Sequence, residues 1–340
     1  MTSGTEGLVR RILELSAIAG PPGREGPVRR GLEALLPPAW RADPPDAAGD
    51  LAVRLSPRPG APRLLLLVPM DEPALVVTGL DRRGRAHAAA LGRWPAAAWR
   101  GGRVRLPSGA RAAVAGGRGP FVGRSRPGGA SVRLDFGFRN RAEAAGAVAE
   151  GDAAVPDLEA VVLPGGAVCG KALASRAACA AALEVCAGAV GPDLAWDATV
   201  AFVGQSELGS PGAAALCRAH PADLVLAVGA VSAAPGAPRG GQVALGAGPA
   251  LLVSDRGLLS ASGALAALEG AAARAGVPLQ RAVADPGASP AGPARTAGPG
   301  VDAAAIGFGL RYPHAPVQVC SPDDVAGAVR VLGALLRAAP

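Results

Sequence analysis

The sequence predicts an α/β fold in which a mainly parallel sheet is flanked by helices and carries a small inserted β-rich domain. Helical and strand patterns alternate through much of the 340 residues, which is typical of parallel sheets. Between residues 74 and 163 the alternation gives way to short β-like runs separated by turns rich in Gly, Pro and Arg. We therefore assign residues 1–73 and 164–340 to the α/β domain and residues 74–163 to the insert.

The first part of the chain predicts two helices and a buried strand. Amphipathic patterns indicate helices at about residues 5–18 and 24–36, and each is followed by a proline pair. The run Leu64–Val68, four leucines and a valine, indicates a buried strand. Asp71 and Glu72 follow directly, so two carboxylates stand in a turn at its carboxyl end.

The second part continues the alternation. Helices are expected near residues 210–220, 263–276 and 321–338, and strands at 199–204, 223–229 and 303–309. The last helix has Ser321 as a candidate N-cap, Pro322 at its first position, and Asp323 and Asp324 in its first turn. These signals favour a well-defined helix start.

The charge distribution bears on possible partners. The formal net charge is +7, but the arginines are scattered along the chain. The densest patch, Arg118 to Arg141, includes three phenylalanines but no nucleic-acid recognition motif. We interpret it as a solvated, loop-rich surface and expect no nucleic-acid partner.

The cysteines and the hydropathy pattern indicate the compartment. No C-x-x-C spacing links the five cysteines, which favours buried thiols in a reducing cytosol. The N-terminus has the pattern of an amphipathic helix rather than a signal peptide. Residues 240–254 are uncharged, but their glycines and Pro249 exclude a spanning helix. We expect a soluble, cytoplasmic protein without a membrane partner.

Two short motifs suggest enzymatic sites. "GGAVCGKA", residues 165–172, nearly matches a phosphate-binding loop, but Ala172 stands where the magnesium-binding hydroxyl is required. "GQSELG" resembles a nucleophile elbow around Ser206, with His314 as a possible triad partner, but Leu208 replaces the final glycine. Neither motif is decisive by itself.

Six segments in order resemble the glutamyl and tetrahedral aminopeptidases, dinuclear zinc or cobalt metallopeptidases of which some are called endoglucanases. These segments are "LSAIAGPPGREGPVRRGL", "DAAGDLAV", "CGKALASRAACAAALEV", "VGQSELGSPGA", "LGAGPALLVSDRG" and "LRYPHAPVQVCSPDDV". The resemblance implies a zinc-aminopeptidase-like sheet, with the insert in the place of the family's oligomerisation domain.

The resemblance also implies which residues occupy the metal-ligand positions. The family's His-x-Asp-Glu motif has Pro69 in place of its histidine ligand, whereas Asp71, which orients that ligand in the family, is kept. Ala174 occupies the position of the aspartate that bridges the two metals. Gly229 occupies the position of another aspartate ligand. Three of the five implied ligands are therefore absent.

The remaining implied site residues are kept only in part. Glu207 and His314 match ligands of one metal, while Ser206 stands at the position of the catalytic glutamate. In the substrate loop, Pro290 stands at the position of an aspartate. A serine hydroxyl is far too weakly basic to take a proton from water near neutral pH. The chain thus resembles a degenerate member of the family.

Three hypotheses follow. The first is a catalytically inactive aminopeptidase-like protein, without a cofactor, retained for assembly or binding. Its partners would be copies of itself, an active paralogue or a peptide. The second is an active metal-dependent aminopeptidase that holds zinc or cobalt with substitute ligands. The third is an anion-binding protein that uses Lys171 and nearby amides. Candidates for the substitute ligands are His87, His220, Asp71, Glu72, Asp223 and Asp255.

Overall fold

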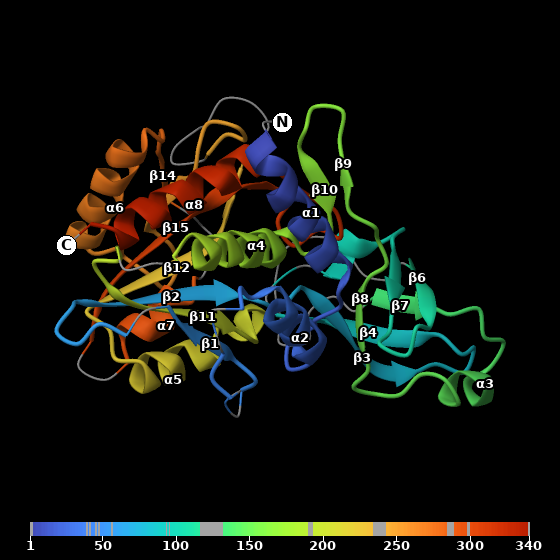
Figure 1. The fold of residues 1–340 in the computed structure, drawn as a ribbon. Helices are drawn as coiled ribbons and strands as arrows, with labels where there is room; N and C mark the ends of the chain where they lie inside the picture. Colours follow the sequence, from blue (N-terminus) through green and yellow to red (C-terminus); the bar gives the residue numbers. More distant parts are fainter. Residues whose placement is uncertain are drawn as a thin grey trace.

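The computed structural model describes residues 3–338 except for 39, 41, 45, 47, 56, 93, 95, 116–131, 190–192, 234–242, 284–288 and 298–299. A large mixed sheet covered by helices lies beside a small closed antiparallel barrel (Figure 1). The predicted α/β class with a small inserted β-rich domain is therefore confirmed. Much of the arginine patch expected between Arg118 and Arg141 lies outside the described residues.

The elements have the following bounds. Helices are α1 (Ser3–Ala17), α2 (Gly26–Leu35), α3 (Arg141–Ala145), α4 (Leu173–Gly188), α5 (Pro211–Ala219), α6 (Ser262–Ala275), α7 (Ala291–Arg295) and α8 (Pro322–Leu336), with 3-10 turns η1 (Ala96–Trp99) and η2 (Ser206–Leu208). Strands of the main sheet are β1 (Leu51–Arg54), β2 (Arg63–Pro69), β9 (Val161–Val162), β10 (Val168–Gly170), β11 (Asp197–Val203), β12 (Leu224–Ser232), β13 (Ala250–Ser254), β14 (Gln280–Val283), β15 (Asp302–Arg311) and β16 (Gln318–Cys320). Barrel strands are β3 (Ala74–Leu80), β4 (Ala86–Leu91), β5 (Arg103–Arg105), β6 (Arg111–Ala115), β7 (Val132–Asp135) and β8 (Ala153–Pro156). The helices and strands predicted outside the insert are present, with ends displaced by a few residues.

The centre of the main sheet is parallel. The strand order is β1-β11-β2-β12-β15-β16-β10-β9, and β2 runs parallel to both β11 and β12. Strand β12 is in turn parallel to β15, whereas β1, β9, β10 and β16 pair antiparallel. Because helices cover both faces, the run Leu64–Val68 in β2 is fully buried. The carboxyl ends of β2, β11 and β12 consequently meet at one edge of the sheet.

Helices cover the two faces of the main sheet. Helices α1, α4, α6 and α8 pack on one face, and α5 and α7 pack on the other (Figure 1). In α4 the buried run from Ala177 to Ala182 consists of alanines and one cysteine, whose small side chains let the helix lie close to its neighbours. The two apolar layers bury both faces of the central strands.

The barrel follows directly from the end of β2. Its strands close in the order β3-β4-β7-β6-β5-β8, around a core that includes the stacked pair Trp94 and Trp99 with ring centroids 4.5 Å apart. The barrel lies to one side of the main sheet (Figure 1). After β8 the chain returns to the main sheet through β9, which pairs with β10.

The start of α8 has the predicted residues but lacks the predicted capping hydrogen bond. Ser321 occupies the N-cap position, but its side chain makes no capping hydrogen bond. The carboxylate of Asp324 accepts hydrogen bonds from the amides of Gly246 and Gly248, both at 2.8 Å. The predicted capping role of Ser321 is therefore wrong, and the Asp324 side chain instead anchors a neighbouring loop.

A helix that crosses a bilayer needs about 20 mostly apolar residues. In the described part of the chain, no helix combines the length and the apolar character that a membrane crossing demands.

Candidate functional site

A cavity of about 280 Å³ lies at the edge where the parallel strands end. Ligand sites of open α/β sheets form at this edge because loops diverge there. The structure brings together at this cavity the site residues named from the sequence, which are Pro69, Asp71, Ala174, Ser206, Glu207, Gly229, Pro290 and His314. They come from distant segments of the chain, so the fold rather than sequence proximity assembles them.

Asp71 positions the turn that carries Glu207. Its buried carboxylate accepts hydrogen bonds from the Ser206 amide at 2.9 Å, from the Ser206 hydroxyl, and from the Glu207 amide at 3.0 Å. Burial raises the pKa of Asp71, while the hydrogen bonds oppose that rise. With its oxygens engaged in this way, Asp71 is a positioning residue and not a free metal ligand.

Two further buried acids hold the preceding part of the same turn. Asp50 Oδ1 accepts from the Gly204 amide at 2.7 Å, and Glu25 Oε1 accepts from the Gln205 amide at 2.8 Å. Four successive amides, from residue 204 to residue 207, thus donate to carboxylates. Burial raises the pKa of Glu25, and it raises the pKa of Asp50 to about 6. Gln205 has a φ of 55°, a left-handed conformation that this network stabilises.

The role of these two acids was not predicted from the sequence. "DAAGDLAV" marked the segment of Asp50 only through the resemblance, in which asparagine occupies that position. Glu25, just before α2, ends the segment "GPPGRE" that belongs to the resemblance, but the sequence suggested no role for it. For Asp50, the available signal was an acid at a position where the resemblance has an amide side chain, within an apolar segment.

Glu207 and His314 face each other across the cavity. Their Oε2 and Nδ1 atoms are 3.8 Å apart, which is too long for a hydrogen bond. Burial, reinforced by Asp71 and Glu72, raises the pKa of Glu207 to about 8, and burial lowers the pKa of His314. Burial therefore disfavours the charged form of both side chains.

The barrel fixes the loop of His314. The indole nitrogen of Trp99 donates a 2.9 Å hydrogen bond to the carbonyl of His314, whose φ is 61°. Gly92, at the end of β4, has a φ of 109°, and a Cβ there would lie 2.8 Å from the carbonyl oxygen of Glu207. The insert consequently contacts both retained site residues and helps to shape the cavity.

The remaining implied ligand positions offer no side-chain donor atoms. Pro69, Ala174 and Gly229 line the cavity, and a Cβ at Gly229 would meet nothing within 4 Å. Gln318 Oε1 accepts a 3.1 Å hydrogen bond from the Ala174 amide, so the start of α4 is tied to β16.

A zinc site usually needs three or four protein ligands. In the ranges that the structure describes, no group of three or more His, Cys, Asp or Glu side chains could hold a metal ion. The residues at this cavity therefore do not fit the dinuclear centre that the resemblance implies.

Glu72 belongs to a buried ion cluster instead of the cavity. Lys171 Nζ lies 2.9 and 2.8 Å from its two carboxylate oxygens, and Arg176 lies 3.2 Å from one of them. Burial lowers the pKa of Lys171 to about 8, although Glu72 counteracts this. Lys171 is fully buried, so it cannot hold a phosphate from solution. The phosphate-loop hypothesis and the anion site built on Lys171 are therefore wrong.

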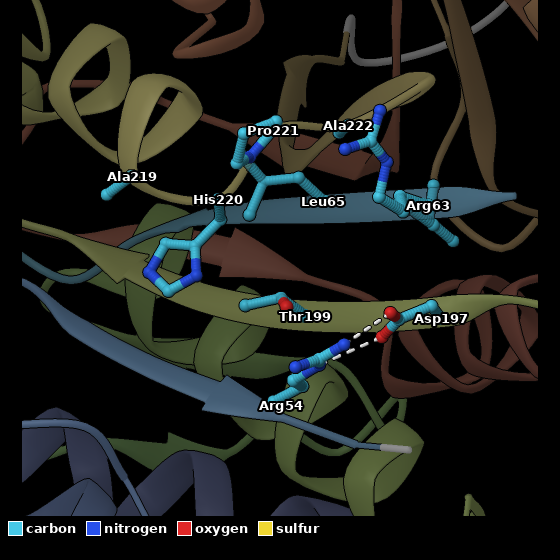
Figure 2. Close-up of a pocket in the computed structure, with 10 residues that line it drawn as sticks. Arg54, Arg63, Leu65, Asp197, Thr199, Ala219, His220, Pro221 and Ala222 are labelled. Carbon is cyan, nitrogen blue, oxygen red and sulfur yellow. Dashed lines mark hydrogen bonds and ion pairs between the residues drawn. The ribbon is translucent and has the colours of Figure 1, made fainter. Parts of the chain in front are cut away.

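Two of the other candidate ligands lie at the opposite edge of the sheet, and a third lies in the barrel. Asp223 pairs with Arg63 at 3.1 Å, before the first residue of β12, as expected from its place at the start of that strand. His220 lines a second cavity of about 180 Å³, in which Figure 2 shows the ion pair of Arg54 with Asp197. The third candidate, His87, lies in β4 of the barrel.

Asp255 lines the first cavity, but its carboxylate is engaged. It accepts hydrogen bonds from the amides of Gly257 and Leu258, both at 2.7 Å, and from the amide of Ser289 at 2.8 Å. Asp255 therefore holds two loops together and is not free to complete a metal site without rearrangement.

The serine-hydrolase hypothesis fails on geometry. The Ser206 hydroxyl donates to Asp71, and no described contact joins it to an imidazole. His314 lies instead against Glu207. A triad requires the nucleophile to hydrogen-bond to its histidine base, so this constellation is absent from the described residues.

Comparison with known proteins agrees with this architecture. A family model described as M42 glutamyl aminopeptidase matches residues 49–331. The glutamyl aminopeptidase of Lactococcus lactis is 29% identical over 97% of this chain and 96% of its own length.

Solved structures are similar over nearly the whole chain. An aminopeptidase from the archaeon Desulfurococcus kamchatkensis superimposes with a TM-score of 0.88 at 23% identity, over 99% of this chain and 96% of that one. The TET1 peptidase of Pyrococcus horikoshii, which can assemble into a tetrahedron or a large octahedral shell, has a TM-score of 0.84 at 22% identity, over 97% and 99% of the two chains. These likenesses show the fold.

Proposed function

The chain belongs to the M42 glutamyl aminopeptidase family, and from that premise we propose that it is a catalytically inactive member whose fold serves assembly or binding. The observation that carries the proposal is the lining of the cavity. Pro69, Ala174 and Gly229 supply no side-chain donor at the positions where the resemblance implies metal ligands. Glu207 and His314 alone are too few for a stable zinc site.

The general base for the proton-transfer step is also absent. A dinuclear hydrolase places two metals about 3.5–4 Å apart and activates a water between them. Ser206 stands where the general base is implied, and its hydroxyl is committed to Asp71. A hydroxyl cannot accept the proton of a water at neutral pH. Both the metal and the base would have to be replaced for hydrolysis.

The hydrogen bonds and ion pairs around the cavity support a selective loss of the catalytic groups. Asp71 still accepts hydrogen bonds from the amides of Ser206 and Glu207, and Lys171 and Arg176 still bind Glu72. These groups stabilise the edge of the sheet whether or not a metal is bound. Their retention beside an apolar cavity suggests that the fold is maintained for a purpose other than catalysis.

We propose that assembly is that purpose. Solved relatives with this fold include a dodecamer and a peptidase that forms a tetrahedron or a large octahedral shell. This chain would form a homo-oligomer or take a subunit position beside an active paralogue. Light scattering coupled to gel filtration tests the first arrangement, since a monomer at micromolar concentration would contradict it.

An active aminopeptidase with substituted ligands is the second candidate. Glu207 and His314 support it, because their 3.8 Å separation across the cavity is compatible with two ligands of one zinc or cobalt ion. Asp255 is a further acid in the lining, but it would have to give up hydrogen bonds to amides.

One experiment separates the two candidates. The purified chain is incubated with excess zinc or cobalt and desalted, and its metal content is measured by elemental analysis together with hydrolysis of aminoacyl p-nitroanilides. The inactive protein retains almost no metal and releases no product. One or two retained metals per chain, with turnover that Glu207→Ala and His314→Ala abolish, would establish the active enzyme. Exposed Arg330→Gln is the control variant for both measurements.

A further inference from the structure

A separate cavity of about 410 Å³ lies beside the amino end of α8. It shares no lining residue with the candidate site. Its walls come from the turn between β9 and β10, the loop near Gly246, the end of β15 and the start of α8. Gly165 and Gly166, from the segment that resembles a phosphate loop, form part of this wall.

Arg311 supplies the positive charge of this cavity. It is the last residue of β15, and its side chain makes no hydrogen bond or ion pair with any residue that the structure describes. Its Nε atom is buried without a partner. A buried donor left unpaired is costly, and a guanidinium presents a planar fork of donors that matches oxyanions.

The start of α8 adds donors of a different kind. The helix has 15 residues, so its amino end carries a substantial partial positive charge and unpaired amides. The Ser321 side chain is only 9% exposed, and its hydroxyl has no partner in the described ranges. Asp324, which would otherwise compete for these donors, is bound to the amides of Gly246 and Gly248.

One carboxylate in the lining repels an anion. Asp323 lines the cavity, although it is exposed and forms no ion pair with Arg311 among the described contacts. Its charge reduces the attraction for an anion but leaves the donors unoccupied. The cavity therefore combines a guanidinium and a hydroxyl without described partners and a helix amino end, set against one exposed carboxylate.

We propose that this cavity binds a phosphate group, free or as a small phosphate monoester, through the Arg311 guanidinium, the Ser321 hydroxyl and the amino end of α8. Phosphate presents several acceptor oxygens in a tetrahedral arrangement, which suits donors that converge from two different elements. The cavity has room for an organic substituent on the phosphate. This site is independent of the proposed loss of catalysis, because it shares no residue with that cavity.

Isothermal titration calorimetry of the full chain tests the site. Inorganic phosphate and glycerol 3-phosphate are titrated separately at an ionic strength held constant with sodium chloride. Tighter binding of glycerol 3-phosphate identifies an ester site, and tighter binding of inorganic phosphate identifies a free-phosphate site. Absence of binding heat for both ligands at millimolar concentration overturns the proposal.

Four variants locate the site. Arg311→Gln is expected to weaken binding at least about tenfold, the usual effect of losing a charge-assisted hydrogen bond. Ser321→Ala should weaken it about threefold, and Asp323→Asn should tighten it by a similar factor. Arg330→Gln, an exposed change on the same helix, removes the same charge and should leave binding unchanged.

The fold of each variant is checked by its melting temperature. Because the side chains of Arg311 and Ser321 make no hydrogen bond within the described structure, their replacement should leave this temperature close to that of the parent. If Arg311→Gln and Arg330→Gln weaken binding equally, the effect is one of net charge, and the proposed site is wrong. If Asp323→Asn fails to tighten phosphate binding, phosphate does not bind in this cavity, and the proposal is likewise wrong.

Discussion

Replacing Asp50 with asparagine removes a charge that the fold buries at a cost. Asp50 is 2% exposed, and its Oδ1 atom accepts the Gly204 amide at 2.7 Å. Its Oδ2 atom is buried without a partner in the described part of the chain and lies against Gly212. Asparagine keeps the shape and the accepting oxygen, so Asp50→Asn isolates the effect of the charge.

The magnitude follows from the pKa of Asp50. Burial raises it from 3.8 to about 6, and Asp46 and Glu25 add to the rise. A folded-state pKa above the unfolded value means that protonated Asp50 favours the fold below pH 3.8 and that this contribution is lost as pH rises through about 6. Two pKa units correspond to about 3 kcal/mol, which the ionised side chain costs the native state at neutral pH.

Asp50→Asn should therefore raise the free energy of unfolding by up to about 3 kcal/mol near pH 7 and change it little near pH 4. Urea denaturation at several pH values across this window measures the difference between parent and variant. Exposed Asp302→Asn is the control and should show no such window. Asp50→Ala, which leaves the Gly204 amide unpaired, should instead be destabilising. A difference between Asp50→Asn and the parent that is constant with pH would refute the reasoning.

Three further predictions concern the buried clusters and the cavity. Lys171→Met removes one of the two charge partners of buried Glu72 and leaves Arg176 as the other. It should therefore lower the free energy of unfolding, measured by urea denaturation, by about 3–5 kcal/mol. A loss below about 1 kcal/mol would contradict this. Trp99→Phe removes the donor to the His314 carbonyl and should cost about 1–2 kcal/mol, with faster amide exchange in the His314 loop as the direct readout. A combined variant carries Pro69→His, Ala174→Asp, Ser206→Glu and Gly229→Asp. Elemental analysis should show that it retains zinc after desalting, whereas none of the four single variants retains zinc.

Part of the candidate site could be predicted because it depends on local patterns. The run Leu64–Val68 predicts a buried strand, and Asp71 follows at its end, where the cavity lies. Glu207 and His314 were paired through the resemblance, and the fold places them 3.8 Å apart. The assignment of Pro69 and other residues to former ligand positions still rests on that resemblance.

Other roles depend on contacts between segments far apart in the chain. Lys171 and Glu72 are separated by 99 residues, and no local pattern indicates that they form a buried ion pair. Ser321 has every local signal of an N-cap, yet its side chain makes no capping hydrogen bond, and Asp324 of the same helix start binds the distant loop near Gly246. Local propensities cannot predict such pairings because the energies come from long-range packing and desolvation.

The sequence by itself determined the α/β class, the β-rich insert and the positions of the buried strands along the chain, because apolar periodicity and turn residues act over a few neighbouring positions. The tertiary structure decided how each charged group is used. It engages Asp71, Asp50 and Glu25 with the amides of one turn and leaves Arg311 unpaired beside α8. A side chain's charge is known from its identity, but its pKa, its partner and its accessibility depend on burial and distance.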